Sequence, residues 1–361
     1  MTSSRCRTLA ALSHAGAAGR VDTLDPDEVE KTSVHCGDDP DGTDQQPAAI
    51  GADLLRRLVP MPDAIQASRR AFIAAHAGEV TGPLRSALSR GRVLVMPVEH
   101  LSGSALVKVV SLHEDSWAQG LPSIEGTVLW IDGPSGRVSA QVDAAALTAL
   151  RTGAASGLAT DLLADPASQV LAMLGAGGQA PDQVAGVCAV RPIREVRVYS
   201  RRAQRGQELC ERLRASHPGV RFIPADSSRA AVDDADVICT ATRSAIPLFE
   251  PADVKKSVHI NAIGAYRLDM REVPSGLLRR AGLVVIDQLD ATLAEAGDVV
   301  AALEDGSIRQ EDLVEIGPLL SGPPVRGEVR QHVTIFKSVG VAAQDWSVCE
   351  LAVERFREAG A

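Results

Sequence analysis

The sequence predicts an α/β fold with a central Rossmann domain and a doubly wound parallel sheet. An apolar run of strand length, Val170–Leu174, stops at the glycine turn G-A-G-G-Q-A, and strand-like and helix-like patterns alternate from there onward. The turn has the dinucleotide-binding spacing G-x-G-x-x-G/A. Alternating strands and helices are typical of a parallel sheet that is covered by helices on both faces.

Each position of the glycine turn has a physical role. Gly175 permits a tight turn, and Gly177 lets a pyrophosphate approach the backbone because it has no side chain. Ala180 is small enough for the next helix to pack closely, and the free N–H groups of that helix would face the phosphates. An ordinary strand–helix turn is the alternative interpretation. The predicted cofactor contacts in this turn are Gly175, Ala176, Gly177, Gly178, Gln179 and Ala180.

The end of the second strand, 195–200, indicates which nicotinamide cofactor is bound. NAD-binding proteins place an acid about twenty residues past the glycines, where it holds the adenosine ribose. Here Ser200 occupies that region and is followed by Arg201 and Arg202. Guanidinium groups bind a 2′-phosphate that a carboxylate would repel. The sequence therefore favours NADP(H) over NAD(H), although the arginines could instead be a solvated pair at a helix start.

The other elements follow from hydrophobic periodicity. A helical pattern over 54–77 is interrupted near Pro60 and Pro62, and the turn at 132–136 predicts a hairpin. A last helix over 341–359 is expected to pack back on the first domain. Strands are predicted at 92–96, 105–111, 126–132, 137–142, 170–174, 195–200, 219–223, 237–240, 259–263 and 283–287, and further helices at 144–163, 179–190 and 203–216.

Composition excludes several classes of protein. The chain of 361 residues is long enough for two domains, and its net charge of -9 argues against a nucleic-acid or anionic-membrane surface. No apolar run approaches the ~20 residues of a membrane span, and we expect no signal peptide. Six cysteines without a C-x-x-C pair favour a reducing, cytoplasmic location. No metal-ligand spacing occurs, so no metal is expected.

Several separated segments resemble one known family. They are Met96-Pro97, Val107–Val110, 120–122 (G-L-P), 147–156 (L-T-A-L-R-T-G-A-A-S), the glycine turn, 240–242 (T-A-T), 261–265 (N-A-I-G-A), 269–272 (D-M-R-E) and 334–340 (T-I-F-K-S-V-G). Together they resemble the ornithine cyclodeaminase/mu-crystallin family of NAD(P)-dependent proteins over residues 50–357. Residues before this region have no counterpart in the resemblance.

The resemblance implies a fold and a chemistry. It implies a homodimer in which both chain ends form an α+β substrate-binding and dimerisation domain beside the Rossmann domain. We therefore expect an extension at 1–47, the substrate domain at 48–148 and 335–361, and the Rossmann domain at 149–334. Members of the family move a hydride between nicotinamide and the α-carbon of a small amino acid or its imine.

Three cations match the family's substrate site. Arg85 matches its substrate arginine, and Arg151 matches an arginine at the substrate carboxylate. A guanidinium suits a carboxylate because it offers two parallel N–H groups. Lys108 lies inside an apolar strand, where a lysine is costly unless it faces a site. Desolvation would lower its pKa and suit it to donate a proton to an imine nitrogen. Surface arginines and a snorkelling lysine are the alternatives.

The remaining matches concern the cofactor. In the family, the position of Thr152 lies at the cofactor phosphate. A T-A-T segment ends a strand on the ligand-binding edge of the sheet, and two further segments match those that flank the nicotinamide. Simple packing is the alternative for these segments. Their residues are Thr240, Ala241, Thr242, Ile263, Gly264, Ser338 and Val339.

One departure bears on the reaction. Cyclodeaminases carry an aspartate directly after the glycine at 264, where this chain has Ala265, and Asp269 comes four residues later. This version resembles the imine-reductase branch and predicts an NAD(P)H-dependent reductase of a small cyclic imino acid. Alternatives are an ornithine or lysine cyclodeaminase, an alanine or N-alkyl amino acid dehydrogenase, and a non-catalytic NADP-binding protein like mu-crystallin.

Overall fold

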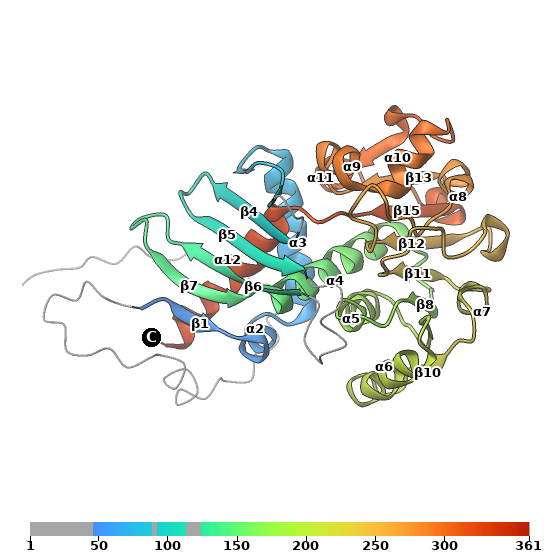
Figure 1. The fold of residues 1–361 in the computed structure, drawn as a ribbon, viewed down its shortest axis with the longest axis horizontal. Coiled ribbons are helices and arrows are strands. Elements are labelled where there is room, and N and C mark those ends of the chain that lie inside the picture. The colour runs from blue at the N-terminus through green and yellow to red at the C-terminus, as the bar shows by residue number, and fades with distance from the viewer. Residues whose placement is uncertain (1–45, 89–91, 113–123, 361) are drawn as a thin grey trace, which may run out of the picture.

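The computed structural model describes residues 46–88, 92–112 and 124–360, which form two lobes joined by a long central helix (Figure 1). Residues 1–45 of the expected extension and the G-L-P segment at 120–122 lie outside the described residues.

One lobe is built on a mostly antiparallel sheet of seven described strands in the order β1-β7-β6-β5-β4-β2, with β3 also paired to β4. β6 and β7 form the predicted hairpin, whose turn is closed by Asp132 and Arg137 through a 2.9 Å backbone hydrogen bond. The strands are β1 (Ala48–Ile50), β2 (Val80–Thr81), β3 (Ser86–Ala87), β4 (Val93–His100), β5 (Ala105–Leu112), β6 (Ile124–Ile131) and β7 (Val138–Asp143).

Four helices pack on one face of this sheet: α2 (Ala52–Leu58), α3 (Met61–His76), α4 (Ala144–Leu163) and α12 (Ala342–Ala359). The predicted break falls between α2 and α3, where Pro60 caps α3 and Pro62 sits in its first turn, a position that needs no backbone donor. α12 is the predicted C-terminal helix, and its Trp346 joins the core of this lobe (Figure 1). The expectation that it packs back on the first domain is therefore confirmed.

The other lobe contains an eight-stranded parallel sheet in the order β10-β9-β8-β11-β12-β15-β13-β14, which confirms the predicted doubly wound fold. Its strands are β8 (Val170–Leu174), β9 (Glu195–Tyr199), β10 (Arg221–Pro224), β11 (Val237–Thr240), β12 (Val258–Ala262), β13 (Leu283–Ile286), β14 (Leu313–Glu315) and β15 (Val333–Lys337). Around it lie α5 (Ala180–Val190), α6 (Ala203–Ser216), α7 (Ser228–Val232), α8 (Ser275–Arg280), α9 (Leu289–Glu295), α10 (Gly297–Glu304), α11 (Ile316–Ser321) and the 3₁₀ turns η2 (Pro251–Asp253), η3 (Gln310–Asp312) and η4 (Gly327–Gln331).

Several strands differ from the sequence pattern, and the short strands β1, β2, β3 and β14 were not predicted. β4 continues to His100 rather than ending at Met96, because it stays paired with β5 beyond that point, with Val98 opposite Leu106. β15 was not predicted, although it lies between β12 and β13 in the sheet and spans the domain boundary that we expected near residue 335. Its pairing partners come from distant parts of the chain, so local pattern carried little information about it.

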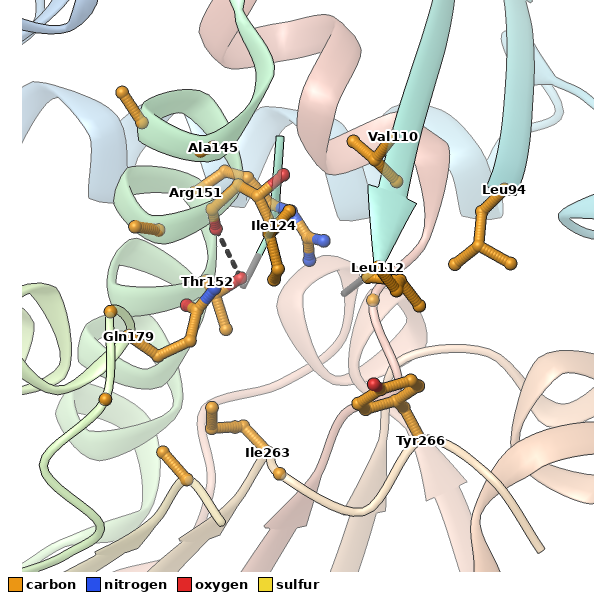
Figure 2. Close-up of a pocket in the computed structure, with 18 of the residues that line it drawn as sticks. Leu94, Val110, Leu112, Ile124, Ala145, Arg151, Thr152, Gln179, Ile263 and Tyr266 are labelled. Atoms are coloured by element: carbon orange, nitrogen blue, oxygen red, sulfur yellow. Dashed lines mark hydrogen bonds between the residues drawn. The ribbon is translucent and has the colours of Figure 1, made fainter. Parts of the chain in front are cut away.

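The packing of α4 on α5 sets the position of the glycine turn. A Cβ added to Gly153 would lie 2.2 Å from the carbonyl oxygen of Asp182, and one added to Gly186 would lie 2.1 Å from that of Gly153. Only glycines allow the two helix backbones to approach this closely. The turn before α5 therefore lies directly beside the face of α4 that carries Arg151 and Thr152 (Figure 2).

Candidate active site

A cavity of about 570 Å³ lies between the two lobes (Figure 2). It opens at the carboxyl ends of β8, β11 and β12, where the strand order reverses and where open α/β sheets bind their ligands. The substrate-domain sheet and α4 form its other walls.

The cavity brings together most of the predicted site residues. Those that line it are Arg85, Lys108, Arg151, Thr152, Gly177, Gly178, Gln179, Ala241, Thr242, Ile263, Gly264, Ser338 and Val339. Those that do not line it are Gly175, Ala176, Ala180, Ser200, Arg201, Arg202 and Thr240. Thr240 is fully buried behind the lining, while the other residues of this second group belong to the glycine turn and to the end of β9.

The glycine turn is shaped to admit a dinucleotide. Gly175 has φ 111°, and a Cβ there would lie 2.5 Å from the carbonyl oxygen of Ala241. A Cβ on Gly177 or Gly178 would meet nothing within 4 Å, so the side of the turn that faces the cavity is open. Gln179 Oε1 is buried without a hydrogen-bond donor among the described residues. The open backbone and the unpaired acceptor fit a phosphate and ribose bound at this turn.

The serine and arginines at the end of β9 lie close to this turn. β9 pairs with β8 so that Tyr199 is opposite Leu174, and Gly175 N donates to Tyr199 O at 2.8 Å. Ser200 follows immediately, and its hydroxyl accepts from Arg202 N at 3.3 Å. Arg201 and Arg202 are exposed. The three residues therefore stand where the adenosine end of a dinucleotide lies in Rossmann folds.

Lys108 is held in a buried cluster of charges at the centre of the cavity wall. Its side chain is 2% exposed, and Nζ donates to Asp345 Oδ2 at 2.6 Å and to Thr148 Oγ1 at 3.4 Å. Asp345 also accepts from Arg151 Nε at 3.0 Å, so one carboxylate is shared by two cations. A buried charge of this kind is tolerated only when it is paired and hydrogen-bonded.

The environment of Lys108 makes it a weaker base than an ordinary lysine. Burial, aided by the repulsion from Arg151 and Arg85 and opposed by the attraction of Asp345, lowers its pKa to about 8. Burial alone would raise the pKa of Asp345, but Arg151 and Lys108 outweigh burial and leave that pKa below its usual value. At neutral pH the pair is therefore an ammonium and a carboxylate, with an ammonium that gives up its proton near pH 8.

Sequence reasoning missed Asp345 and Gln344, which both lie in the first turn of α12. Gln344 Oε1 accepts from Arg151 Nη1 at 2.8 Å and from Val341 N at 3.0 Å. An acid and an amide in the apolar start of a helix were the only local signal. Nothing in the spacing connects position 345 with Lys108, which lies 237 residues earlier.

Arg85 reaches the cavity between β2 and β3. Its Nε donates to Glu295 Oε1 at 2.6 Å, its Nη2 donates to Glu295 Oε2, and Nη2 also donates to Val339 O at 3.0 Å. Its guanidinium carbon lies 5.8 Å from the centre of the Tyr266 ring, within the range of a cation–π contact. No motif or spacing in the sequence pointed to Glu295 as the partner of Arg85.

The cavity wall formed by the sheet is apolar. Its side chains come from β4, β5 and β6, and Leu94, Val110 and Leu112 lie across the cavity from Gln179 of the glycine turn (Figure 2). Asp143 is the one carboxylate among the described lining residues, against five cations, and it is occupied in capping α4 through Ala146 N at 2.7 Å. The cavity therefore suits an anionic ligand with an apolar body. The apolar side chains are Leu94, Met96, Val110, Leu112 and Ile124.

Glu272 fixes the loops at the cofactor side of the cavity, and sequence reasoning missed it as well. It is fully buried and accepts from Thr240 Oγ1 at 2.9 Å, Thr242 N at 2.6 Å, Gly264 N at 2.7 Å and Ala265 N at 3.1 Å. Burial raises the pKa of Glu272, although the nearby Lys337 and the donors from Thr242 limit the rise. The carboxyl group ties the loop after β11 to the loop after β12.

The position after Gly264 carries no acid into the cavity. Ala265 is fully buried, and its backbone faces Glu272 rather than the cavity. Asp269 does not fold back to replace an aspartate there, because its side chain is 68% exposed and pairs with Arg267.

No group of three or more His, Cys, Asp or Glu side chains among the described residues could hold a metal ion. None of the helices in the described part of the chain is long and apolar enough to cross a membrane.

Known proteins match this chain over nearly all of its described length. A Delta(1)-pyrroline-2-carboxylate reductase of Bacillus cereus is 32% identical over 318 residues, covering 86% of this chain and 97% of the relative. Thermococcus litoralis Delta(1)-pyrroline-2-carboxylate reductase, solved with NADH and L-proline, superposes with a TM-score of 0.82 at 31% identity, covering 87% of this chain and 98% of that one. An archaeal alanine dehydrogenase dimer with bound NAD superposes with a TM-score of 0.79 at 28% identity, covering 87% and 97%. Residues 54–360 also match the profile of the Ornithine cyclodeaminase/mu-crystallin family, and the chain belongs to that family.

Proposed function

We propose that this protein is an NAD(P)H-dependent reductase of a small cyclic imino acid of the Δ1-pyrroline-2-carboxylate or Δ1-piperideine-2-carboxylate type, giving the L-amino acid. The proposal rests chiefly on the place of Lys108. Its buried ammonium has a pKa of about 8 and faces the same cavity as the glycine turn. The relatives from Bacillus cereus and Thermococcus litoralis, which are named for this activity, support it.

Different residues of the cavity bind the substrate and donate the proton. Arg85 and Arg151 bind the substrate carboxylate, which places the adjacent C=N carbon near the loops after β11 and β12. A bound reduced nicotinamide supplies a hydride to that carbon. Lys108 donates a proton to the imine nitrogen, so that C=N becomes CH–NH, and its neutral amine regains a proton from solvent between turnovers.

The apolar wall of the cavity contacts the ring of the substrate. Leu94, Val110 and Ile124 surround the space left for the ring, and they offer no partner to a distal ammonium group. Burying an unpaired ammonium would be costly. This wall, together with Ala265, disfavours a cyclodeaminase acting on ornithine or lysine.

The direct test is loss of the NADPH absorbance when the purified protein is given Δ1-pyrroline-2-carboxylate or its six-membered analogue, with formation of proline or pipecolate. Absence of turnover with every cyclic imine would contradict the proposal. Release of ammonia from ornithine without net consumption of reduced cofactor would favour a cyclodeaminase.

We further propose that NADP(H) is preferred over NAD(H), supported by Ser200, Arg201 and Arg202 beside the glycine turn. A carboxylate at position 200 would repel a 2′-phosphate and attract a free ribose. Ser200→Asp should therefore lower the ratio of kcat/KM for NADPH to that for NADH by about tenfold or more. An unchanged ratio would contradict the preference.

A homodimer is proposed as the assembly, supported by the dimeric archaeal alanine dehydrogenase. The face of the first sheet that points away from its helices carries Val95, Val107, Val109 and Leu129, all partly exposed. Apolar side chains gathered on one sheet face favour a second copy of the chain packed against that face.

A cytoplasmic location is also proposed, supported by four free thiols at Cys188, Cys210, Cys239 and Cys349.

A further inference from the structure

Arg85 is held from across the boundary between the two lobes. It belongs to the substrate-binding lobe, whereas Glu295 ends α9 in the Rossmann lobe, 210 residues later. The pair is largely shielded from water, with side chains 11% and 19% exposed. Two parallel hydrogen bonds join the Glu295 carboxylate to one edge of the Arg85 guanidinium. This bidentate geometry makes an arginine–carboxylate pair strong and fixes its orientation.

Glu295 projects from a rigid corner. A Cβ on Gly297 would lie 2.1 Å from the carbonyl oxygen of Met270, so the chain is pressed against that loop. Asp298 accepts from Glu272 N at 2.5 Å and from the ammonium of Lys337 at 2.8 Å. The corner between α9 and α10 is therefore fixed before any substrate arrives.

The contacts of Arg85 leave one nitrogen for a ligand. Its Nε and Nη2 are occupied by Glu295 and Val339 O, whereas Nη1 has no partner among the described residues. Arg85 lines the cavity, but Glu295 does not. The acid thus holds the guanidinium from behind and does not occupy the space of the substrate carboxylate.

We infer that Glu295 is a positioning residue for substrate recognition, which aims Arg85 Nη1 at the substrate carboxylate. This inference rests on the proposed function of Arg85. Arginine has a long, flexible side chain, and its planar fork loses less freedom on binding when it is already oriented. Because the contact crosses the lobes, Arg85 is oriented only while the two lobes hold their present arrangement, so substrate affinity depends on that arrangement.

The test is Glu295→Gln, which keeps the shape of the side chain and removes its charge. We expect KM for the cyclic imine to rise about 10- to 100-fold with a much smaller change in kcat, as expected when ground-state and transition-state binding weaken alike. The Kd of NADPH, measured by fluorescence in the absence of substrate, should stay unchanged. Asp290→Asn removes an exposed acid from the same helix and serves as the control, with KM unaltered.

A double-mutant cycle with Arg85→Lys separates the inference from the function on which it rests. If Glu295 acts through Arg85, Glu295→Gln should add little to the rise in KM already caused by Arg85→Lys. Fully additive effects, or a lower KM in Glu295→Gln, would overturn the positioning role while leaving Arg85 as the carboxylate ligand. An unchanged KM in Arg85→Lys would instead remove Arg85 from the proposed site.

Discussion

At the scale of single residues, the chemistry of the site depends on how buried charges are paired. Lys108, Arg151 and Asp345 form a cluster with two cations and one carboxylate. Burial lowers the pKa of Lys108 to about 8, because it outweighs the attraction of Asp345, and the repulsion from Arg151 adds to the lowering. A proton donor with a pKa near the working pH is both mostly protonated and able to give up its proton.

We predict that imine reduction falls as pH rises through about 8, because only the protonated form of Lys108 donates. Lys108→Met should lower kcat by about 10²- to 10⁴-fold. Lys108→Arg keeps the positive charge, but a guanidinium stays protonated well above pH 8. The residual rate of this variant should therefore not fall near pH 8. The pH profile of kcat/KM is the measurement, and an unchanged profile in Lys108→Arg would contradict the role of this group.

Asp345→Asn should destabilise the fold by about 3–5 kcal/mol, because Lys108 and Arg151 would stay buried without a counter-ion. Urea unfolding measures this loss. Glu358→Gln, on the exposed side of the same helix, is the control and should change stability by less than about 0.5 kcal/mol. Since Asp345 raises the pKa of Lys108, the fall in rate should also move below pH 8 in Asp345→Asn. A fall that moves to higher pH would contradict the pairing.

At the scale of elements, the carboxyl ends of β11 and β12 form the cofactor side of the cavity through Glu272. Its carboxylate oxygens accept hydrogen bonds from backbone N–H and hydroxyl groups of both loops. An amide in its place would present an N–H group to other donors, and a buried donor left unpaired costs about 1–3 kcal/mol.

Glu272→Gln is therefore expected to weaken NADPH binding by about tenfold and to lower the urea midpoint. Fluorescence titration gives the affinity independently of turnover. Glu304→Gln, an exposed acid on α10, provides the matched control. Full affinity in Glu272→Gln would show that the two loops keep their positions without the carboxylate.

At the scale of the whole molecule, the two lobes share one cavity. No helix of the described residues packs on one face of the first lobe's sheet. Val109→Lys would place a charge in the middle of that face, opposite Val95 on β4. We expect it to convert the proposed dimer to a monomer in sedimentation. Ile246→Lys, at an apolar residue of the other lobe that is 71% exposed, should leave the assembly intact. A dimeric Val109→Lys protein would contradict this interface.

Much of the fold could be predicted from the local sequence pattern. The glycine turn and the alternating elements predicted the Rossmann sheet, because strand-to-helix turns use few residue types. The position of Lys108 in an apolar strand marks it as unusual from the sequence alone. β15 was not predicted, because its pairing partners β12 and β13 lie far away in the chain. β4 extends beyond the predicted end because it stays paired with β5, the next strand along the chain.

The class of fold and the dinucleotide turn could be predicted from residue types at short spacing, and Lys108 stood out in an apolar strand. Arg85 and Arg151 were predicted from the resemblance to the family. Only the tertiary structure decided which acids those cations meet. Asp345 and Glu295 lie 237 and 210 residues from the side chains that they hold. No local spacing encodes such pairs, since they exist only after α12 and α9 have packed beside the cavity.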